Sequence, residues 1–161
     1  MQKLLLAMVV VFSMGMTGSV FAQDFQKGLK AYDAKDYAAA LKEFRILAER
    51  GHAGAQHKLG WMYLGGFGVL KDVKESVFWV RKAAEQGDAE AQASLAMAYE
   101  FGHGVIKDNV YTHAWYNIAS ANGYMEASIE RNEIEKKMTA AEIAKAQELA
   151  RECVKKNYKG C

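Results

Sequence analysis

Two glycine-rich stretches are the first places at which this sequence could do chemistry. Residues 66–72 read GFGVLKD and residues 102–108 read GHGVIKD. Closely spaced glycines followed by a lysine can cradle a phosphate through backbone N–H groups and an ammonium. Here each stretch follows a helical pattern instead of a strand, and neither matches GxxxxGKS/T or GxGxxG. We therefore interpret both stretches as turns between helices. The turn residues are Gly66, Gly68, Asp72, Gly102, Gly104 and Asp108.

The four histidines and the nucleophilic side chains show no arrangement typical of an active site. His52, His57, His103 and His113 form neither an H-E-x-x-H motif nor an i, i+4 pair. The serine motifs G-x-S-x-G and S-x-x-K are missing, and so is K-T-G. The sequence therefore predicts no catalytic residue, no metal and no cofactor.

Both cysteines, Cys153 and Cys161, lie in the C-terminal tail. In an oxidising compartment two thiols at this spacing can form a disulfide that closes a small loop. Such a bridge stabilises a fold by about 2–3 kcal/mol at most. Two free thiols or an intermolecular bridge are the alternatives. We expect the disulfide.

The N-terminus has the layout of a secretory signal peptide. Lys3 is followed by an apolar run over residues 4–12, and small residues precede a cut after Ala22. We predict a signal peptide over residues 1–22 and a mature chain that is periplasmic or secreted. No later stretch is apolar enough to span a bilayer, so we expect no membrane insertion after cleavage.

Composition narrows the classes of fold and partner. Lysine and arginine number 21 against 19 acidic residues, which gives a formal net charge of +2. Such a balance offers no electrostatic reason to expect nucleic acid or an anionic membrane as the partner. Proline is absent, which favours helices over a sandwich or barrel.

The chain repeats itself at an offset of 36 residues, starting with Ala55 and Ala91. Further pairs at this offset are Gln56–Gln92, Leu59–Leu95, Tyr63–Tyr99, Val69–Val105, Lys71–Lys107, Asp72–Asp108, Trp79–Trp115, Ala83–Ala119 and Gly87–Gly123. Each unit reads as two helices with apolar stripes at helical spacing. Asp72 is the expected N-cap of the second helix, with Glu75 completing a capping box, and Gly87 is expected to end it.

The repeated unit A-x-x-x-L-G-x-x-Y-x-x-G-x-G-V-x-x-D resembles the Sel-one-like repeat, a relative of the tetratricopeptide repeat. The resemblance implies an all-α fold, an α/α solenoid of helix-turn-helix repeats with a C-terminal capping helix. Thr139 and Glu142 form a capping box at the start of that closing helix. The expected divisions are a tetratricopeptide-like pair over 23–54, Sel-one-like repeats over 55–90 and 91–126, and a degenerate repeat with the cap over 127–161.

Solenoids of this kind present a concave surface that usually holds peptides or other proteins. Trp61 lies two residues from both Leu59 and Tyr63, so it should face away from the core of its own repeat. Met97 is its counterpart in the next repeat. The predicted partner-binding residues on the concave face are His57, Trp61, Met97 and Glu100. Packing between adjacent repeats, or a lone exposed aromatic, is the alternative interpretation of these side chains.

The sequence is thus interpreted as an exported, non-enzymatic scaffold for a protein or peptide partner. Trp79 and Trp115 occupy equivalent positions at which the family packs an aromatic between helices, so we expect both in the core. A hydrolase of cell-wall or β-lactam substrates, or a penicillin-binding protein, is the alternative, implied only by resemblance to cysteine-rich relatives. Those relatives carry a cysteine pair in each repeat, whereas this chain has that spacing once, at Cys153 and Cys161.

Overall fold

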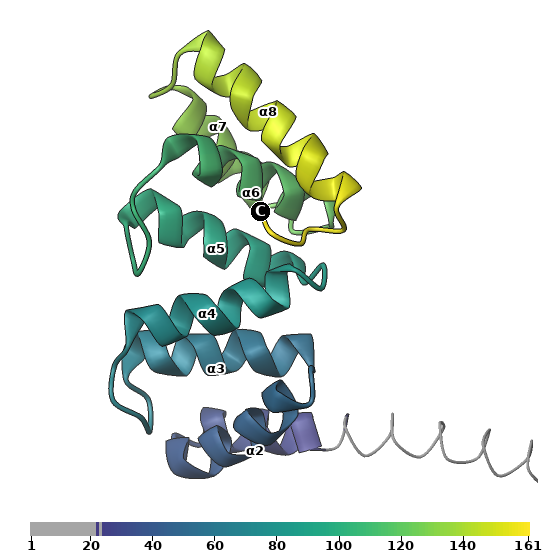
Figure 1. Cartoon of the computed structure of the whole chain (residues 1–161). Coiled ribbons are helices and arrows are strands. Elements are labelled where there is room, and N and C mark those ends of the chain that lie inside the picture. Colours follow the sequence, from purple (N-terminus) through teal and green to yellow (C-terminus); the bar gives the residue numbers. More distant parts are fainter. Residues whose placement is uncertain (1–21, 23) are drawn as a thin grey trace, which may run out of the picture.

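The computed structural model describes residue 22 and residues 24–161. Apart from Ala22, the predicted signal peptide lies outside the described residues. Within them every regular element is a helix, as the sequence predicts (Figure 1). A helical segment over residues 24–33 precedes the helices α2 Tyr37–Glu49, α3 Ala53–Gly65, α4 Val73–Ala84, α5 Ala89–Phe101, α6 Asn109–Ala121, α7 Ala127–Glu135 and α8 Ala140–Lys155.

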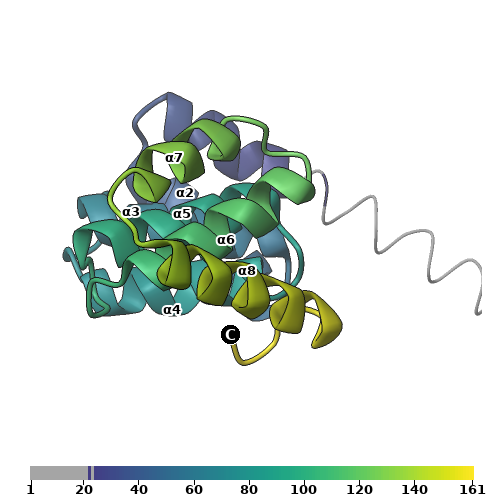
Figure 2. The same ribbon diagram turned by 90° about the horizontal axis from the view of Figure 1, so that it is seen from above.

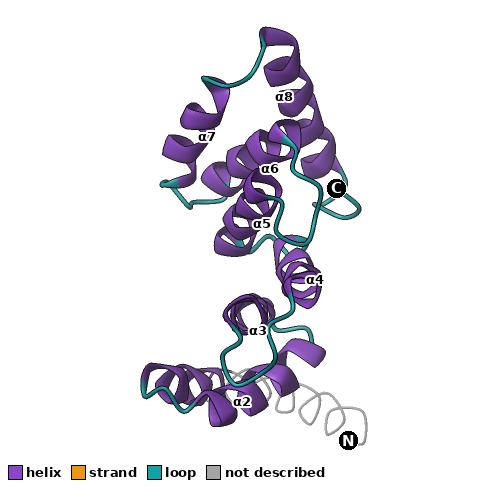
Figure 3. Ribbon diagram, turned by 90° about the vertical axis from the view of Figure 1, so that its left-hand side faces the viewer, coloured by secondary structure: helices purple, strands orange, loops and turns teal. Residues whose placement is uncertain are grey.

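The helices stack in chain order as an α/α solenoid, which confirms the predicted fold class. Each of α2 to α6 packs against the next helix, and α6 also packs against α8. Seen from the side, α3, α5 and α7 lie along one side of the stack, and α4 and α8 lie along the other (Figure 3). In the view along the stack, α7 and α8 cover the earlier helices (Figure 2).

The two glycine-rich stretches are the turns from α3 to α4 and from α5 to α6. Asp72 N-caps α4, because its side chain accepts hydrogen bonds from the N–H groups of Lys74 and Glu75 at 2.9 and 3.1 Å. The reciprocal half of the predicted capping box does not form. The backbone N–H of Asp72 instead donates to the carbonyl of Tyr63 at 2.9 Å and thereby closes the turn.

A glycine in each turn allows one repeat to rest on the preceding one. Gly68 and Gly104 have φ values of +69° and +73°, and a Cβ atom on them would lie 2.7 Å from the Tyr37 carbonyl oxygen and 2.5 Å from that of Val73. Tyr37 and Val73 are the first residues of α2 and α4. The turn of each repeat therefore contacts the start of the second helix of the unit before it.

Buried glutamines connect successive repeats. Gln56 and Gln92 donate to the carbonyl oxygens of Ala48 and Ala84, at 3.0 and 3.1 Å. Both side chains are buried, so these bonds satisfy polar groups that would otherwise be costly to bury. The recurrence of the same bond 36 residues later shows that the sequence period is a structural period.

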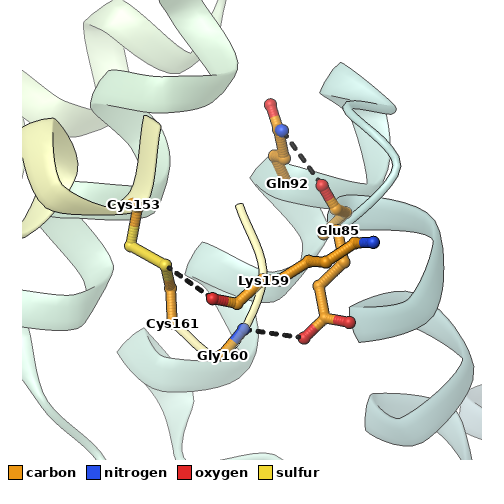
Figure 4. Close-up of a disulfide and its surroundings, with 7 residues drawn as sticks. Glu85, Gln92, Cys153, Lys159, Gly160 and Cys161 are labelled. Atoms are coloured by element: carbon orange, nitrogen blue, oxygen red, sulfur yellow. Dashed lines mark hydrogen bonds between the residues drawn. A yellow bond between two sulfur atoms is a disulfide. The ribbon is translucent and has the colours of Figure 1, made fainter. Parts of the chain in front are cut away.

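The C-terminal segment closes the stack with α8, whose buried residues are Ala146, Ala150 and Cys153. The predicted capping box is present, because the side chain of Thr139 and the carboxylate of Glu142 each accept the other's backbone N–H. Cys153 and Cys161 form a disulfide (Figure 4). The tail then folds back onto the repeats, with the N–H of Gly160 donating to the Glu85 carboxylate at 3.4 Å.

We expect Cys161→Ser to lower the free energy of unfolding by about 2 kcal/mol, because the variant loses the constraint that the bridge places on the unfolded chain. Cys161 is the better position to change, since Cys153 is 1% exposed and a hydroxyl there would be buried. Urea titrations with and without a reducing agent measure the effect. The reductant should lower the stability of the wild type to that of the variant and leave the variant unchanged; a reductant effect on the variant would contradict this prediction.

A candidate binding groove on the concave face

An apolar pocket of about 250 Å³ opens between α3 and α5, with α4 as its floor. Nearly all of its lining is aliphatic, aromatic or thioether surface. The lining residues are Trp61, Leu64, Ser76, Val77, Val80, Ser94, Met97, Ala98, Phe101 and His103. This pocket exists because α3 and α5 are successive first helices, held apart by the α4 that packs against both. It can accept one large apolar side chain.

A wider and more polar groove of about 560 Å³ adjoins the pocket and shares Trp61, Ser94, Met97 and Phe101 with it. The groove also contains His57 and Glu100, so the four residues that the sequence singles out all line it. Together, the pocket and the groove form what we call the concave groove.

Trp61 stands at the junction of the pocket and the wider groove, 36% exposed. Its indole N–H donates to Nε2 of His57 at 2.8 Å, and the same Nε2 lies 2.8 Å from Oγ of Ser94 on α5. The two aromatic rings meet edge to face, with centroids 6.3 Å apart. These contacts fix the orientation of the indole and leave its exposed part turned towards the groove.

His57 corrects one expectation, because it is only 5% exposed and does not form a contact surface of its own. Its Nε2 lies within hydrogen-bond distance of Oγ of Ser94 on the neighbouring repeat. Burial lowers the pKa of His57 below its usual 6.5, against the opposing effect of Asp88 and Glu90. Since Nε2 accepts the indole N–H, the neutral ring carries its proton on Nδ1, which faces Glu90 at 3.8 Å. His57 therefore positions Trp61.

Met97 and Glu100 are both partly buried on α5. A carboxylate oxygen of Glu100 accepts a hydrogen bond from the hydroxyl of Tyr116 at 3.1 Å. Burial, together with this carboxylate, strongly raises the pKa of Tyr116, so its hydroxyl stays protonated and remains a donor. The hydrogen bond thereby holds the carboxylate of Glu100 at the edge of the groove.

Phe101 and Val80 are among the groove residues that sequence reasoning did not single out. Phe101 is 60% exposed and lies one helical turn after Met97, so the i, i+4 spacing was available as a signal. Val80 lies beneath the space between α3 and α5, a position that follows only from the stacking of the helices. Trp115 is buried, as expected for a core residue, and Trp79 packs partly buried against the core around Phe44.

Two further properties of the described part of the chain bear on its chemistry. Among residues 22 and 24–161, no three histidine, cysteine, aspartate or glutamate side chains gather closely enough to hold a metal ion. None of the helices described over the same residues has both the length and the apolar character needed to cross a membrane.

Acidification should weaken the support of Trp61. Because burial lowers the folded-state pKa of His57, its contribution to stability is complete above pH 6.5 and is lost as the pH falls below that value. The charges on Asp88, Glu90 and Lys58 change the size of the pKa shift of His57 but not its downward direction. We expect the free energy of unfolding to fall more steeply below pH 6.5 in the wild type than in His57→Gln, by at most about 1.4 kcal/mol per pH unit. Urea titrations at several pH values measure this, and parallel curves would contradict it.

The stack of two-helix units with a groove along one face defines a helical-repeat protein of the α/α solenoid class. Within that class, residues 53–88 and 89–124 each match the family model of the Sel1 repeat, so the chain contains two Sel1 repeats. Both matched windows begin two residues before the units expected from the sequence. Sel1-repeat proteins are helical scaffolds that generally take part in protein–protein interaction and are typically non-enzymatic.

Solved structures of the same kind agree with this assignment. A protective antigen present in uropathogenic Escherichia coli strains, which displays an SLR fold, is similar with a TM-score of 0.81 and 32% identity, over 86% of this chain and 31% of that one. A Sel1 repeat protein from Oxalobacter formigenes is similar with a TM-score of 0.63 and 33% identity, over 66% of this chain and 44% of that one. The chain thus spans less than half of either protein. No curated protein matches it.

Proposed function

We propose that this protein is an exported helical-repeat scaffold that binds a protein or peptide partner in the concave groove. The observation that carries the proposal is an open apolar pocket with a tryptophan fixed beside it. Trp61 and Phe101 are 36% and 60% exposed at the edge of this pocket. Large aromatic side chains around a desolvated pocket are the usual centre of a protein-binding surface.

The geometry suits an extended segment of a partner better than a flat surface. The apolar pocket has room for one large side chain, and the wider groove of about 560 Å³ can hold the residues next to it. Hydrogen bonds through His57 and Ser94 restrain Trp61 before any partner arrives. Less conformational freedom is then lost on binding, which favours affinity.

Two features support export. The signal-peptide pattern over residues 1–22 predicts it, and a disulfide between Cys153 and Cys161 persists in an oxidising compartment. N-terminal sequencing of protein recovered from the periplasm or the medium tests this part, and the mature chain should begin at residue 23. Capture of a partner by the wild type, and its loss when Trp61 and Met97 are both truncated, tests the binding part.

A further inference from the structure

Carboxylates gather along one part of the concave groove. The wider groove is lined by four glutamates and a single lysine. They are Glu90, Glu100, Glu126, Glu130 and Lys58. The whole chain has a formal net charge of +2, so the negative charge here is a local feature that overall composition conceals. The groove therefore combines an apolar pocket with an acidic border.

Lys58 is the single lysine or arginine of the described chain that lines this border. Glu126 and Glu130 are exposed, and among residues 24–161 no lysine or arginine lies within 4.0 Å of either carboxylate or of Glu100. The hydrogen bond that Glu100 accepts comes from the neutral hydroxyl of Tyr116. Glu90 faces His57, whose burial favours the uncharged ring. These carboxylates are consequently available to cations from outside the molecule.

The C-terminal ends of two helices lie at the apolar pocket. Both α3 and α5 end beside the apolar pocket, where Leu64 and Phe101 line it. The C-terminal end of a helix carries a partial negative charge and favours a cation nearby. Helix C-termini thus border the apolar pocket, and the glutamates line the wider groove that adjoins it.

We infer that the partner presents a cationic segment, in which a large apolar side chain is flanked within a few residues by lysine or arginine. This inference rests on the proposed function and specifies the partner of the same groove. The apolar side chain enters the pocket beside Trp61 and Met97, and the flanking cations face Glu100, Glu126 and Glu130. Charge complementarity of this kind raises the rate of association and selects against acidic partners.

Selection from a random peptide library displayed on phage tests the inference with the purified full chain as bait. We expect the enriched sequences to place lysine or arginine within three residues of leucine, methionine, phenylalanine or tryptophan. Enrichment of acidic or uncharged sequences would overturn it. The best enriched peptide is then made synthetically with a fluorescent label for anisotropy titrations.

Two variants separate the chemistry of the partner from the location of the site. The double change Glu126→Gln and Glu130→Gln should weaken binding of the labelled peptide at least tenfold and reduce the salt dependence of that binding. The control Glu75→Gln, on α4 outside the groove, should change the affinity for the peptide less than twofold. Equal affinities for all three proteins would overturn the inference. If the peptide still requires Trp61 in that case, the groove remains the site and only the cationic partner is wrong. If binding survives Trp61→Ala as well, the proposed function fails with it.

Discussion

Alanine in place of Gly104 should lower the free energy of unfolding by about 3 kcal/mol, a large share of the stability of a domain of this size. Two costs add. The residue has φ +73°, a left-handed conformation that costs a side-chain-bearing residue roughly 1–2 kcal/mol. The new Cβ would also lie 2.5 Å from the carbonyl oxygen of Val73. Relieving this clash requires the two repeats to move apart or the backbone to distort, at a further cost of about 1–3 kcal/mol.

Gly102 provides the matched control, because it lies in the same turn with φ +71° but has no close neighbour. A Cβ there would approach the Val105 carbonyl oxygen at 3.6 Å, an ordinary contact. We expect Gly102→Ala to cost only about 1 kcal/mol. Gly68 and Gly66 form the equivalent pair one repeat earlier. Urea unfolding followed by circular dichroism measures all four variants, and equal losses within each pair would show that the turns do not support stacking.

Truncating Trp61 and Met97 together to alanine should weaken partner binding by about a thousandfold. Both side chains line the apolar pocket and the wider groove, and central contacts of this kind often contribute 2 kcal/mol or so each. The fold should survive, since Trp61 is 36% exposed and His57 keeps its contact with Ser94. We expect an unchanged helix content and a loss of at most about 2 kcal/mol in the free energy of unfolding.

Capture from a periplasmic extract by immobilised protein, followed by mass spectrometry, measures this effect. The control is a double change of Phe78 and Ile46 to alanine, because both are exposed apolar residues, 48% and 39%, that line neither the pocket nor the wider groove. The control should capture the same partners as the wild type. Undiminished capture by the Trp61 and Met97 variant would show that the partner binds elsewhere.

The sequence period was enough to predict the stack of helices, because each repeated residue has a repeated structural task. Gln56 and Gln92 bond to the carbonyl at the end of the preceding helix, and Asp72 and Asp108 cap the next one. The glycine-rich stretches could be interpreted as turns because each of them follows a helical pattern and not a strand. What the period did not disclose is why Gly68 and Gly104 are glycines, since their close neighbours are in the previous repeat.

The candidate site was predictable in position but not in the division of tasks among its residues. Helical periodicity placed Trp61 away from its own core, and the offset of 36 related it to Met97. The environment of His57, which is 5% exposed, could not be read from its own helix, because its Nε2 contacts Ser94 of the next repeat. The acidic border could not be read from any one helix either. Glu100 lies on α5, Glu126 in the turn before α7 and Glu130 on α7, and the three meet only after the helices stack.

Photocrosslinking in living cells tests most directly whether the concave groove is the binding face. A photoreactive phenylalanine derivative replaces Phe101, in the groove, or Phe78, outside it; the two side chains are 60% and 48% exposed and so are comparably accessible. We predict a discrete covalent adduct with a partner from position 101 and none from position 78. An adduct from position 78 with none from position 101 would contradict the assignment of the groove.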